Sequence, residues 1–338
     1  MKIATALALV TSGRLRSMKA VLDLAGQTTR AHFLVGAARE GILRALASGP
    51  VEEATLAARL GFPSGSAGLR AWLRVGRALG ELREEGGRWS LRGTLARALA
   101  EEENDDLAAM LEEVATLHAR LLHETPLRLR ERRPFTLADQ DGSLIARSSR
   151  VLEPLLAEVV EEHVPQRGPF RLLEVGCGSG VYLRRATERN PEIQAVGLEL
   201  QPEVARQARA NLEAWGVSAR VRVETQDLRE RPAEQAFDLV TLHNNIYYFP
   251  ARERVGVLRH AASFLVPGGR LVVTTACPGG SPSGAALDLW GEMTEGCGGL
   301  PDPEVLRGQL TEAGLVAVTA RNVGAPLESF YAFAGTRA

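Results

Sequence analysis

Cysteine, lysine and long apolar runs are all scarce in this sequence of 338 residues. The three cysteines, Cys177, Cys277 and Cys297, are too few and too scattered for a disulfide framework or a cysteine-based zinc site, and we predict no metal site. Only two of the 40 basic residues are lysine, which indicates a coding bias rather than a function. No stretch approaches the roughly 18 consecutive apolar residues of a membrane span, so we predict none.

The first residues are apolar but lack the pattern of a signal peptide. Residues 3–10 are apolar or small and run directly into Thr11 to Arg14 without a cleavage site in register. Together with the scarcity of cysteine, this predicts a cytoplasmic protein whose cysteines remain thiols.

Neither sign of charge is in excess over the whole chain, which carries 40 basic and 41 acidic residues. This balance excludes a uniformly basic nucleic-acid coat and an acidic disordered chain. The distribution is uneven, because residues 1–100 hold 15 basic against 7 acidic side chains and residues 101–338 hold 25 against 34. The length and this asymmetry both favour two domains.

The first hundred residues are predicted to be mainly helical. Apolar residues recur at helical spacing over 31–46, and further helices are predicted at 55–61 and 66–79. Gly86 and Gly87 then separate two short segments, which indicates a hairpin. The order of three helices and a hairpin is typical of a winged helix-turn-helix.

A helical segment and an α/β region complete the predicted organisation. Residues 101–165 are charged and helical, so we predict a linker and substrate cap between a domain of residues 1–100 and one of residues 166–338. In the last region short apolar runs alternate with helices, which predicts a mostly parallel sheet covered on both faces. Two late runs, 315–322 and 329–335, are predicted to form an antiparallel hairpin.

The strongest motif is LLEVGCGSG, in which a strand ends and Gly176, Gly178 and Gly180 turn into a helix. The third glycine follows the first by four positions, whereas a dinucleotide-binding fingerprint requires five. Glu174 would repel a pyrophosphate but can accept a hydrogen bond from an ammonium group. The loop therefore predicts a zwitterionic, amino-acid-like ligand rather than a dinucleotide.

Two further carboxylates follow the next two predicted strands. Glu199 ends the second strand, where a carboxylate can accept both hydroxyls of a ribose. Asp227 follows the third strand and can accept from an adenine amino group. Because the carboxyl ends of parallel strands meet at one edge of a sheet, we expect both to lie near the glycine loop.

With these motifs the sequence resembles the class I S-adenosylmethionine-dependent methyltransferases, through the segments EVGCGSG, GLEL, TQDL, FDLVTLHNNIYYF and LVPGGRLVVTT. Residues 20–100 resemble the winged-helix dimerisation domain of small-molecule O-methyltransferases of the plant caffeate and bacterial polyketide type. The resemblance implies a Rossmann-like, seven-stranded α/β methyltransferase domain behind an N-terminal all-α winged-helix domain. It also implies a homodimer and S-adenosyl-L-methionine as cofactor.

The resemblance further implies which residues would bind the cofactor. The methionine part would be held by Glu174, Gly176, Gly178 and Gly180. The ribose would be held by Glu199 and the adenine amino group by Asp227, with Leu200 and Leu228 packing near the ring. His243 and Asn244 would lie near the methionine part and the transferring methyl.

A general base is harder to place. Members of the plant type carry a catalytic histidine in the helix after the fourth strand, where this sequence has Arg252 and Glu253. His260 stands two turns further on and is predicted to lie at the surface.

The segment from His243 to Tyr248 is the predicted reaction edge. His243, Asn244 and Tyr247 are the candidate catalytic residues, with His243 as a possible base, and Asn245 and Tyr248 are predicted to orient the substrate. In the alternative reading His243 caps the strand and the tyrosines belong to the core.

The glycine-rich insertion 277–301 resembles segments that close over the substrate in this fold. We predict that its Trp290 and Met293 contact the substrate. Their three-residue helical spacing also suits an alternative in which they pack the insertion onto the sheet.

A basic stripe on the third helix, Arg70, Arg74 and Arg77, is the feature that would suit DNA. Acidic residues in the same wing and the absence of Asn and Gln from the helix argue against DNA binding. The predicted function is methyl transfer from S-adenosylmethionine to a small molecule, first to a hydroxyl oxygen because of the domain pairing. Methylation of S, N or C, a different reaction in the same fold, and a ligand-sensing transcription regulator are the alternatives.

Overall fold

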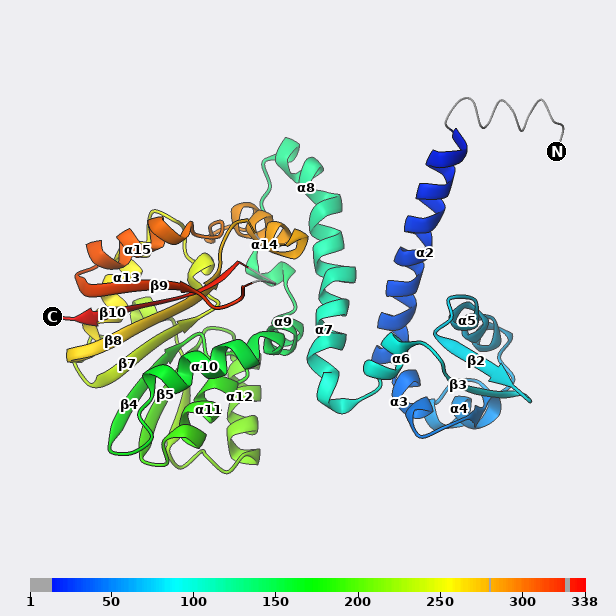
Figure 1. Cartoon of the computed structure of the whole chain (residues 1–338), viewed down its shortest axis with the longest axis horizontal. Coiled ribbons are helices and arrows are strands. Elements are labelled where there is room, and N and C mark those ends of the chain that lie inside the picture. Colours follow the sequence, from blue (N-terminus) through cyan, green and yellow to red (C-terminus); the bar gives the residue numbers. More distant parts are fainter. Residues whose placement is uncertain (1–13, 280, 326–328) are drawn as a thin grey trace. The chain divides into compact units, whose positions relative to one another are not determined.

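A computed structural model describes residues 14–279, 281–325 and 329–338. The chain divides between Ala115 and Thr116 into two compact units (Figure 1). The segment at residues 3–10 for which we predict no signal function lies outside the described residues. Within the described ranges, every helix is too short or too polar to cross a bilayer.

The N-terminal unit consists of helices and a small antiparallel sheet. Its helices are α2 (Arg14–Arg39), α3 (Ile42–Ala47), α4 (Glu53–Leu60), α5 (Ala67–Ala78), α6 (Thr94–Ala98) and α7 (Asp105–Glu113). Its strands are β1 (Val51–Glu52), β2 (Leu82–Glu85) and β3 (Arg88–Leu91), in the order β1-β3-β2. The predicted succession of helices and a hairpin is present. α2 begins 17 residues before the apolar pattern that predicts it.

The core of this unit gathers Leu34, Leu43, Leu73 and Trp89, each at most 1% exposed. Beside it Glu81 is buried, pairs with Arg30 at 2.5 Å and accepts a hydrogen bond from the backbone of α6. The buried carboxylate is thus satisfied on both sides.

The basic stripe on α5 is largely neutralised within the unit. Arg70 forms an ion pair with Glu53 at 3.0 Å, and Arg77 pairs with Glu84 at 2.6 Å. Phosphate binding would have to break these pairs, which weakens the case for DNA.

The C-terminal unit is built on a seven-stranded sheet within the described residues, in the order β6-β5-β4-β7-β8-β10-β9. Its strands are β4 (Phe170–Val175), β5 (Ile193–Glu199), β6 (Val221–Thr225), β7 (Phe237–His243), β8 (Leu265–Ala276), β9 (Leu315–Asn322) and β10 (Phe330–Arg337). β4 to β8 pair in parallel, and β10 is antiparallel to both β8 and β9. The predicted α/β fold and terminal hairpin are confirmed.

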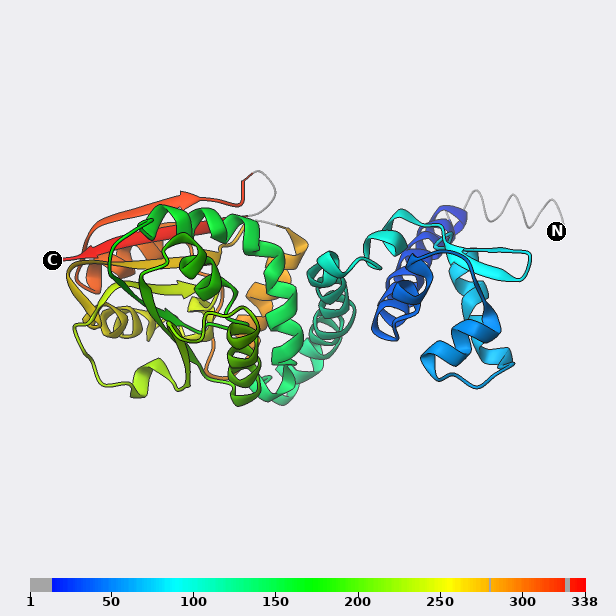
Figure 2. The same cartoon turned by 90° about the horizontal axis from the view of Figure 1, so that it is seen from below.

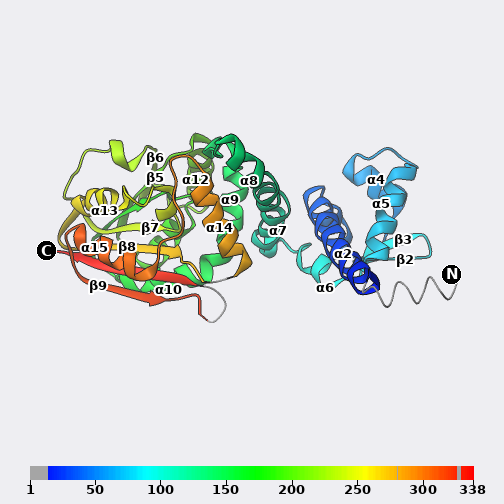
Figure 3. The same ribbon diagram turned by 90° about the horizontal axis from the view of Figure 1, so that it is seen from above.

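Helices cover both faces of this sheet. The helices of this unit are α8 (Ala119–Glu131), α9 (Gly142–Ser148), α10 (Glu153–His163), α11 (Val181–Arg189), α12 (Pro202–Ala214), α13 (Arg254–Ser263), α14 (Pro282–Met293) and α15 (Pro303–Glu312). One apolar cluster packs α10, α11 and α12 on the face that Leu172 presents. Figure 2 shows the green helices of this unit from below. A second apolar cluster packs α13 and α15 on the face that Leu173 presents (Figure 3). The crossover helices bring the carboxyl ends of β4 to β7 to one edge.

Candidate functional site

A cavity of about 290 Å³ opens at this carboxyl edge of the sheet. Most of the predicted site residues line it, namely Gly176, Gly178, Glu199, Leu200, Asp227, Leu228, His243, Asn244, Asn245, Tyr247 and Tyr248. They come from four successive parallel strands or the turns that follow them, so the sheet topology itself brings them together.

The glycine loop between β4 and α11 requires glycine at each predicted position. Gly176, Gly178 and Gly180 have φ angles of 65°, 53° and 81°, a region that other residues avoid. A Cβ on Gly176 would lie 2.5 Å from Nδ2 of Asn245, which donates to the carbonyl of Val175. Gly180 directly precedes α11, so the helix N-terminus stands behind the loop.

Glu199 ties the glycine loop to the end of β5. One carboxylate oxygen accepts from the backbone N–H of Gly178 and the other from that of Gln201, both at 3.0 Å. Burial raises the pKa of Glu199, and the backbone donors oppose that rise. A carboxylate with two fixed donors keeps lone pairs for the hydroxyls of a ligand.

Asp227 begins the turn after β6 and forms a two-pronged ion pair with Arg229, whose Nη2 lies 2.6 Å from its Oδ2. Arg229 holds the pKa of Asp227 below its usual value. His260 supports this turn from α13, with Nε2 3.0 Å from the carbonyls of Leu228 and Arg231. The prediction of a surface His260 is therefore wrong, because its ring is half-buried against the backbone.

Two asparagines at the end of β7 leave acceptor atoms at the cavity wall. Asn244 has a φ of 52° and donates its N–H to the carbonyl of Thr274 at 2.6 Å. The side-chain oxygens of Asn244 and Asn245 are buried without a hydrogen-bond partner among the residues that the structure describes. Such atoms are costly unless a ligand or a water satisfies them.

His243 is buried at the floor of the cavity. Its Nδ1 lies 2.9 Å from the hydroxyl of Thr274, and the ring of Tyr182 approaches edge-on at 5.1 Å. Burial without a carboxylate partner lowers the pKa of His243 to about 3, so the imidazole is neutral at neutral pH.

Glu174 does not line the ligand cavity, contrary to the prediction that it contacts the ligand. Its side chain is 1% exposed and lines a second cavity, of about 10 Å³, that also borders His163, Thr241 and His243. Side chains alternate along a strand, and Val175 is the neighbour that faces the larger cavity. Any effect of Glu174 on a ligand over the loop therefore acts through the loop.

Trp290 and Met293 lie in an apolar cluster rather than at the cavity wall. Their neighbours there include Leu121 and Phe135, and the Trp290 ring lies 6.0 Å from that of Tyr247. They pack the insertion, as in the alternative reading, but against α8 and the turn after β7 rather than onto the sheet. Their effect on a substrate would be indirect, through the tyrosine that they support.

The sequence predicts a substrate cap within residues 101–165 and a closing insertion at 277–301, but it singles out none of the residues that form one wall of the cavity. Ile145, Ala146 and Ser149 of α9 and its end face the cavity, and so do Leu137 and the Glu295–Gly296 turn. No motif marks these residues. The sequence signal that could have located the start of α9 is Asp141, which caps the helix by accepting a hydrogen bond from the backbone N–H of Leu144.

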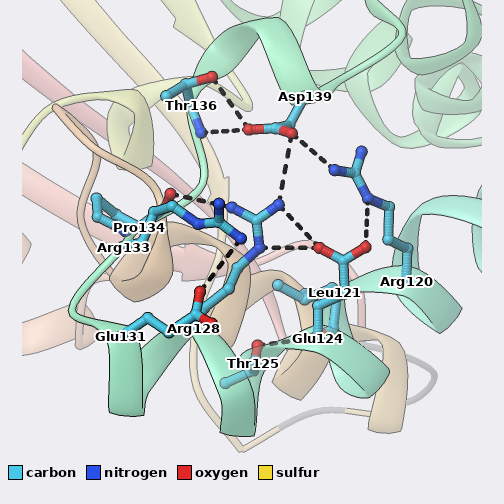
Figure 4. Close-up of polar contacts among 10 residues, drawn as sticks. All are labelled: Arg120, Leu121, Glu124, Thr125, Arg128, Glu131, Arg133, Pro134, Thr136 and Asp139. Carbon is cyan, nitrogen blue, oxygen red and sulfur yellow. Dashed lines mark hydrogen bonds and ion pairs between the residues drawn. The ribbon is translucent and has the colours of Figure 1, made fainter.

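A charged network anchors the segment that leads to this wall (Figure 4). Arg128 of α8 is 8% exposed, lies 2.8 Å from Glu124 and 3.7 Å from Asp139, and stacks over the Phe135 ring at 3.9 Å. Phe135 in turn exchanges backbone hydrogen bonds with residues 293–295. The network therefore holds together two segments that both reach the cavity.

We predict that Arg128→Met lowers the melting temperature by about 2–8 °C, because it removes a largely buried guanidinium with its stacking and hydrogen bonds. Calorimetric melting measures the effect. Arg120→Met is the matched control, since Arg120 joins the same two carboxylates from a more exposed position and should shift the melting temperature by less than about 2 °C. Equal shifts would contradict a special role for Arg128.

Comparison with known proteins agrees with this geometry. Residues 172–269 match a family model described as "Methyltransferase domain". Demethylspheroidene O-methyltransferase from Rhodobacter capsulatus is 27% identical over 189 residues, which are 54% of this chain and 46% of that relative. The chain thus spans about half the length of this relative.

Two solved structures resemble nearly the whole chain. An O-methyltransferase family protein from Burkholderia thailandensis has a TM-score of 0.73 at 23% identity, covering 95% of this chain and 98% of its own. Mitomycin 7-O-methyltransferase has a TM-score of 0.76 at 19% identity, covering 97% and 100%. At these identities the likeness establishes the fold. The predicted class I fold is thereby confirmed, and residues 172–269 match the methyltransferase domain model.

Proposed function

We propose that this chain transfers a methyl group from S-adenosyl-L-methionine to a hydroxyl oxygen of an apolar, aromatic small molecule. The observation that carries the proposal is the single cavity that joins the glycine loop and Glu199 to a chamber of aromatic side chains. A cofactor half and an acceptor half in one enclosed space are what direct group transfer requires.

The residues present fit the cofactor. The backbone of Gly176 and Gly178 would surround the methionine part, and Glu199 would accept hydrogen bonds from the ribose hydroxyls. Asp227 would accept a hydrogen bond from the adenine amino group once its ion pair with Arg229 opens. The partnerless oxygens of Asn244 and Asn245 suit the ammonium group or the polarised methyl hydrogens. When bound, the cofactor supplies an electrophilic methyl on a sulfonium.

The acceptor half favours a flat, uncharged molecule. Tyr247, Tyr248 and Ile145 of α9 line it, whereas Phe249 lies beneath Arg229 beside Asp227. Arg229 is the basic side chain at the cavity, and it is engaged by Asp227. The names of the similar proteins, which methylate oxygen, support a hydroxyl acceptor.

The chain itself supplies alignment more than base catalysis. A histidine with a pKa of about 3 cannot hold a proton taken from a phenol, whose pKa is near 10. We therefore propose His243 as a positioning residue that orients the acceptor hydroxyl, together with Asn244 and Tyr247. Transfer then depends on an in-line arrangement from which water is excluded.

Calorimetry with S-adenosylmethionine, followed by a screen of phenolic acceptors for release of S-adenosylhomocysteine, tests this function. We expect binding, and turnover with at least one phenol. Absence of cofactor binding would overturn the proposal, and turnover confined to thiols or amines would replace the hydroxyl acceptor.

We further propose a homodimer formed through the N-terminal unit, with residues 1–100 as dimerisation domain, 101–165 as linker and cap, and 166–338 as cofactor domain. α2 exposes large apolar side chains along its first half, namely Leu15, Met18, Val21, Leu22 and Leu24. A second copy of the same helix would bury them.

Leu22→Glu is expected to convert the dimer to a monomer, because it places a charge in the middle of this apolar face. Sedimentation velocity measures the outcome. Val316→Glu, which changes an exposed apolar residue of the other unit, should leave the dimer intact. A monomeric parent chain, or a dimer in the Leu22 variant, would contradict this assignment.

A further inference from the structure

Polar residues border the small, mainly apolar cavity beside the ligand cavity. Glu174 of β4, Thr241 of β7 and His163 at the end of α10 all border it. Tyr182 and His243 border both this cavity and the larger one, so they form the partition between them.

Several of these groups are buried without a partner. Both carboxylate oxygens of Glu174, the hydroxyl of Thr241 and Nδ1 of His163 lack a hydrogen bond to any part of the chain that the structure describes. The cavity volume of about 10 Å³ is close to that of one water, and a water is stable where two to four polar groups surround it. The geometry therefore suits one buried water shared by these three side chains.

The charges around Glu174 disfavour its ionised form. On β5 the charged group that faces it is Glu199, which is also acidic. On the other neighbouring elements Tyr182 of α11 is neutral, and His243 and His163 are both held neutral by burial. Burial and Glu199 together raise the pKa of Glu174 well above its usual value.

More distant charged residues affect the pKa values of Tyr182 and His163 rather than that of Glu174. Glu153 and Arg150 act on Tyr182, while Glu162, Arg270 and Arg321 act on His163. His163 is half-buried at the end of its helix, so its ring connects the cavity with the surface.

We propose that this cavity is a proton-holding site linked to the ligand cavity, in which Glu174 keeps its proton while the glycine loop is empty and gives it up when a cationic ligand binds over the loop. The O–H bond of the carboxyl group breaks, and the proton passes through the shared water and Nδ1 of His163 to solvent. This inference rests on the proposed cofactor, which carries a sulfonium charge.

The direction of the effect follows from linkage. A cation over Gly176 stabilises the carboxylate of Glu174, which lies on the strand that leads into the loop, and so favours loss of the proton. Ligand affinity must then rise as the pH rises towards the pKa of Glu174 in the empty protein. S-adenosylhomocysteine lacks the sulfonium charge and should release less of the proton.

Calorimetry of S-adenosylmethionine binding at neutral pH, in buffers of different ionisation enthalpy, counts the protons released. The native chain is expected to release up to about one proton per cofactor bound, and Glu174→Gln none. The affinity of the variant should also lose its dependence on pH. Tight binding by the native chain without proton release, or equal release by Glu174→Gln, would overturn the proposal.

A second variant keeps the test decisive if Glu174→Gln does not fold. Thr241→Val retains the side-chain shape but removes one partner of the water, so the pH midpoint of the affinity should move upward. Thr187→Val is the matched control, since Thr187 is equally buried but bonds within α11, and its midpoint should not move. Equal midpoints in all three chains would contradict the shared water.

An infrared measurement separates this inference from the proposed function. In the chain without ligand, a protonated-carboxyl band that is lost in Glu174→Gln, or shifted in Thr241→Val, would support the proton-holding site even if S-adenosylmethionine did not bind. Absence of the band would refute the site even if the cofactor bound.

Discussion

Glu199→Ala is expected to weaken S-adenosylmethionine binding by at least about 100-fold. The side chain does two things that alanine cannot do. It holds the N–H groups of Gly178 and Gln201, each at 3.0 Å, and it offers its remaining lone pairs to a ribose. Losing it removes the ligand contact and leaves the glycine loop without its tie to β5.

Calorimetric titration with the cofactor measures this loss, and circular dichroism checks that the variant is folded. Glu203→Ala is the matched control, because Glu203 stands four residues later on α12 and is exposed. We expect native affinity for that control. An affinity within a factor of about three of the native value in Glu199→Ala would contradict the ribose assignment and with it the cofactor.

The cofactor edge was predictable from the sequence because its signals are local. Each glycine of the loop is required by its own backbone conformation, and Glu199 and Asp227 stand directly after apolar runs that end as strands. The rule that parallel strands end at one edge then brings them together.

Glu174 shows how a local motif can mislead. Its place two residues before Gly176 suggests the same ligand, yet the pleat of β4 turns Glu174 towards α10 and Val175 towards the cavity. The alternation of side chains along a strand predicts that Glu174 and Val175 face opposite sides, but the glycine motif drew the assignment of Glu174 to the ligand.

The α9 wall and the first half of α2 were not predictable for a different reason. Ile145 and Ala146 have their role only because α8 and the Arg128 network place their segment over the sheet, and no spacing within the sequence encodes that contact. The first half of α2 buries no face in its own unit, and its apolar residues Leu15, Met18 and Leu22 are exposed, so no contact within the unit marks this part of the helix.

Gly176→Val is the second change with a large expected effect, namely loss of measurable cofactor binding in a chain that still folds. Valine at a φ of 65° costs about 1–2 kcal/mol or more in backbone strain. Its Cβ would also displace the Asn245 amide, which lies 2.5 Å from that point and is held by the carbonyl of Val175. The substitution therefore disturbs the loop and an asparagine of the cavity wall at once.

Gly168→Val is the matched control that distinguishes the effect of backbone strain from the effect of damage to the cofactor site. Gly168 also has a positive φ, of 90°, but a Cβ there would meet nothing within 4 Å and the residue lies before β4, at the end of the sheet opposite the cavity. Both variants should therefore melt at a lowered temperature, Gly176→Val at the lower of the two because of its additional clash with Asn245, whereas only Gly176→Val should lose the calorimetric signal of S-adenosylmethionine. If the two variants bound the cofactor equally well, close approach to the glycine loop could not be how this chain holds it.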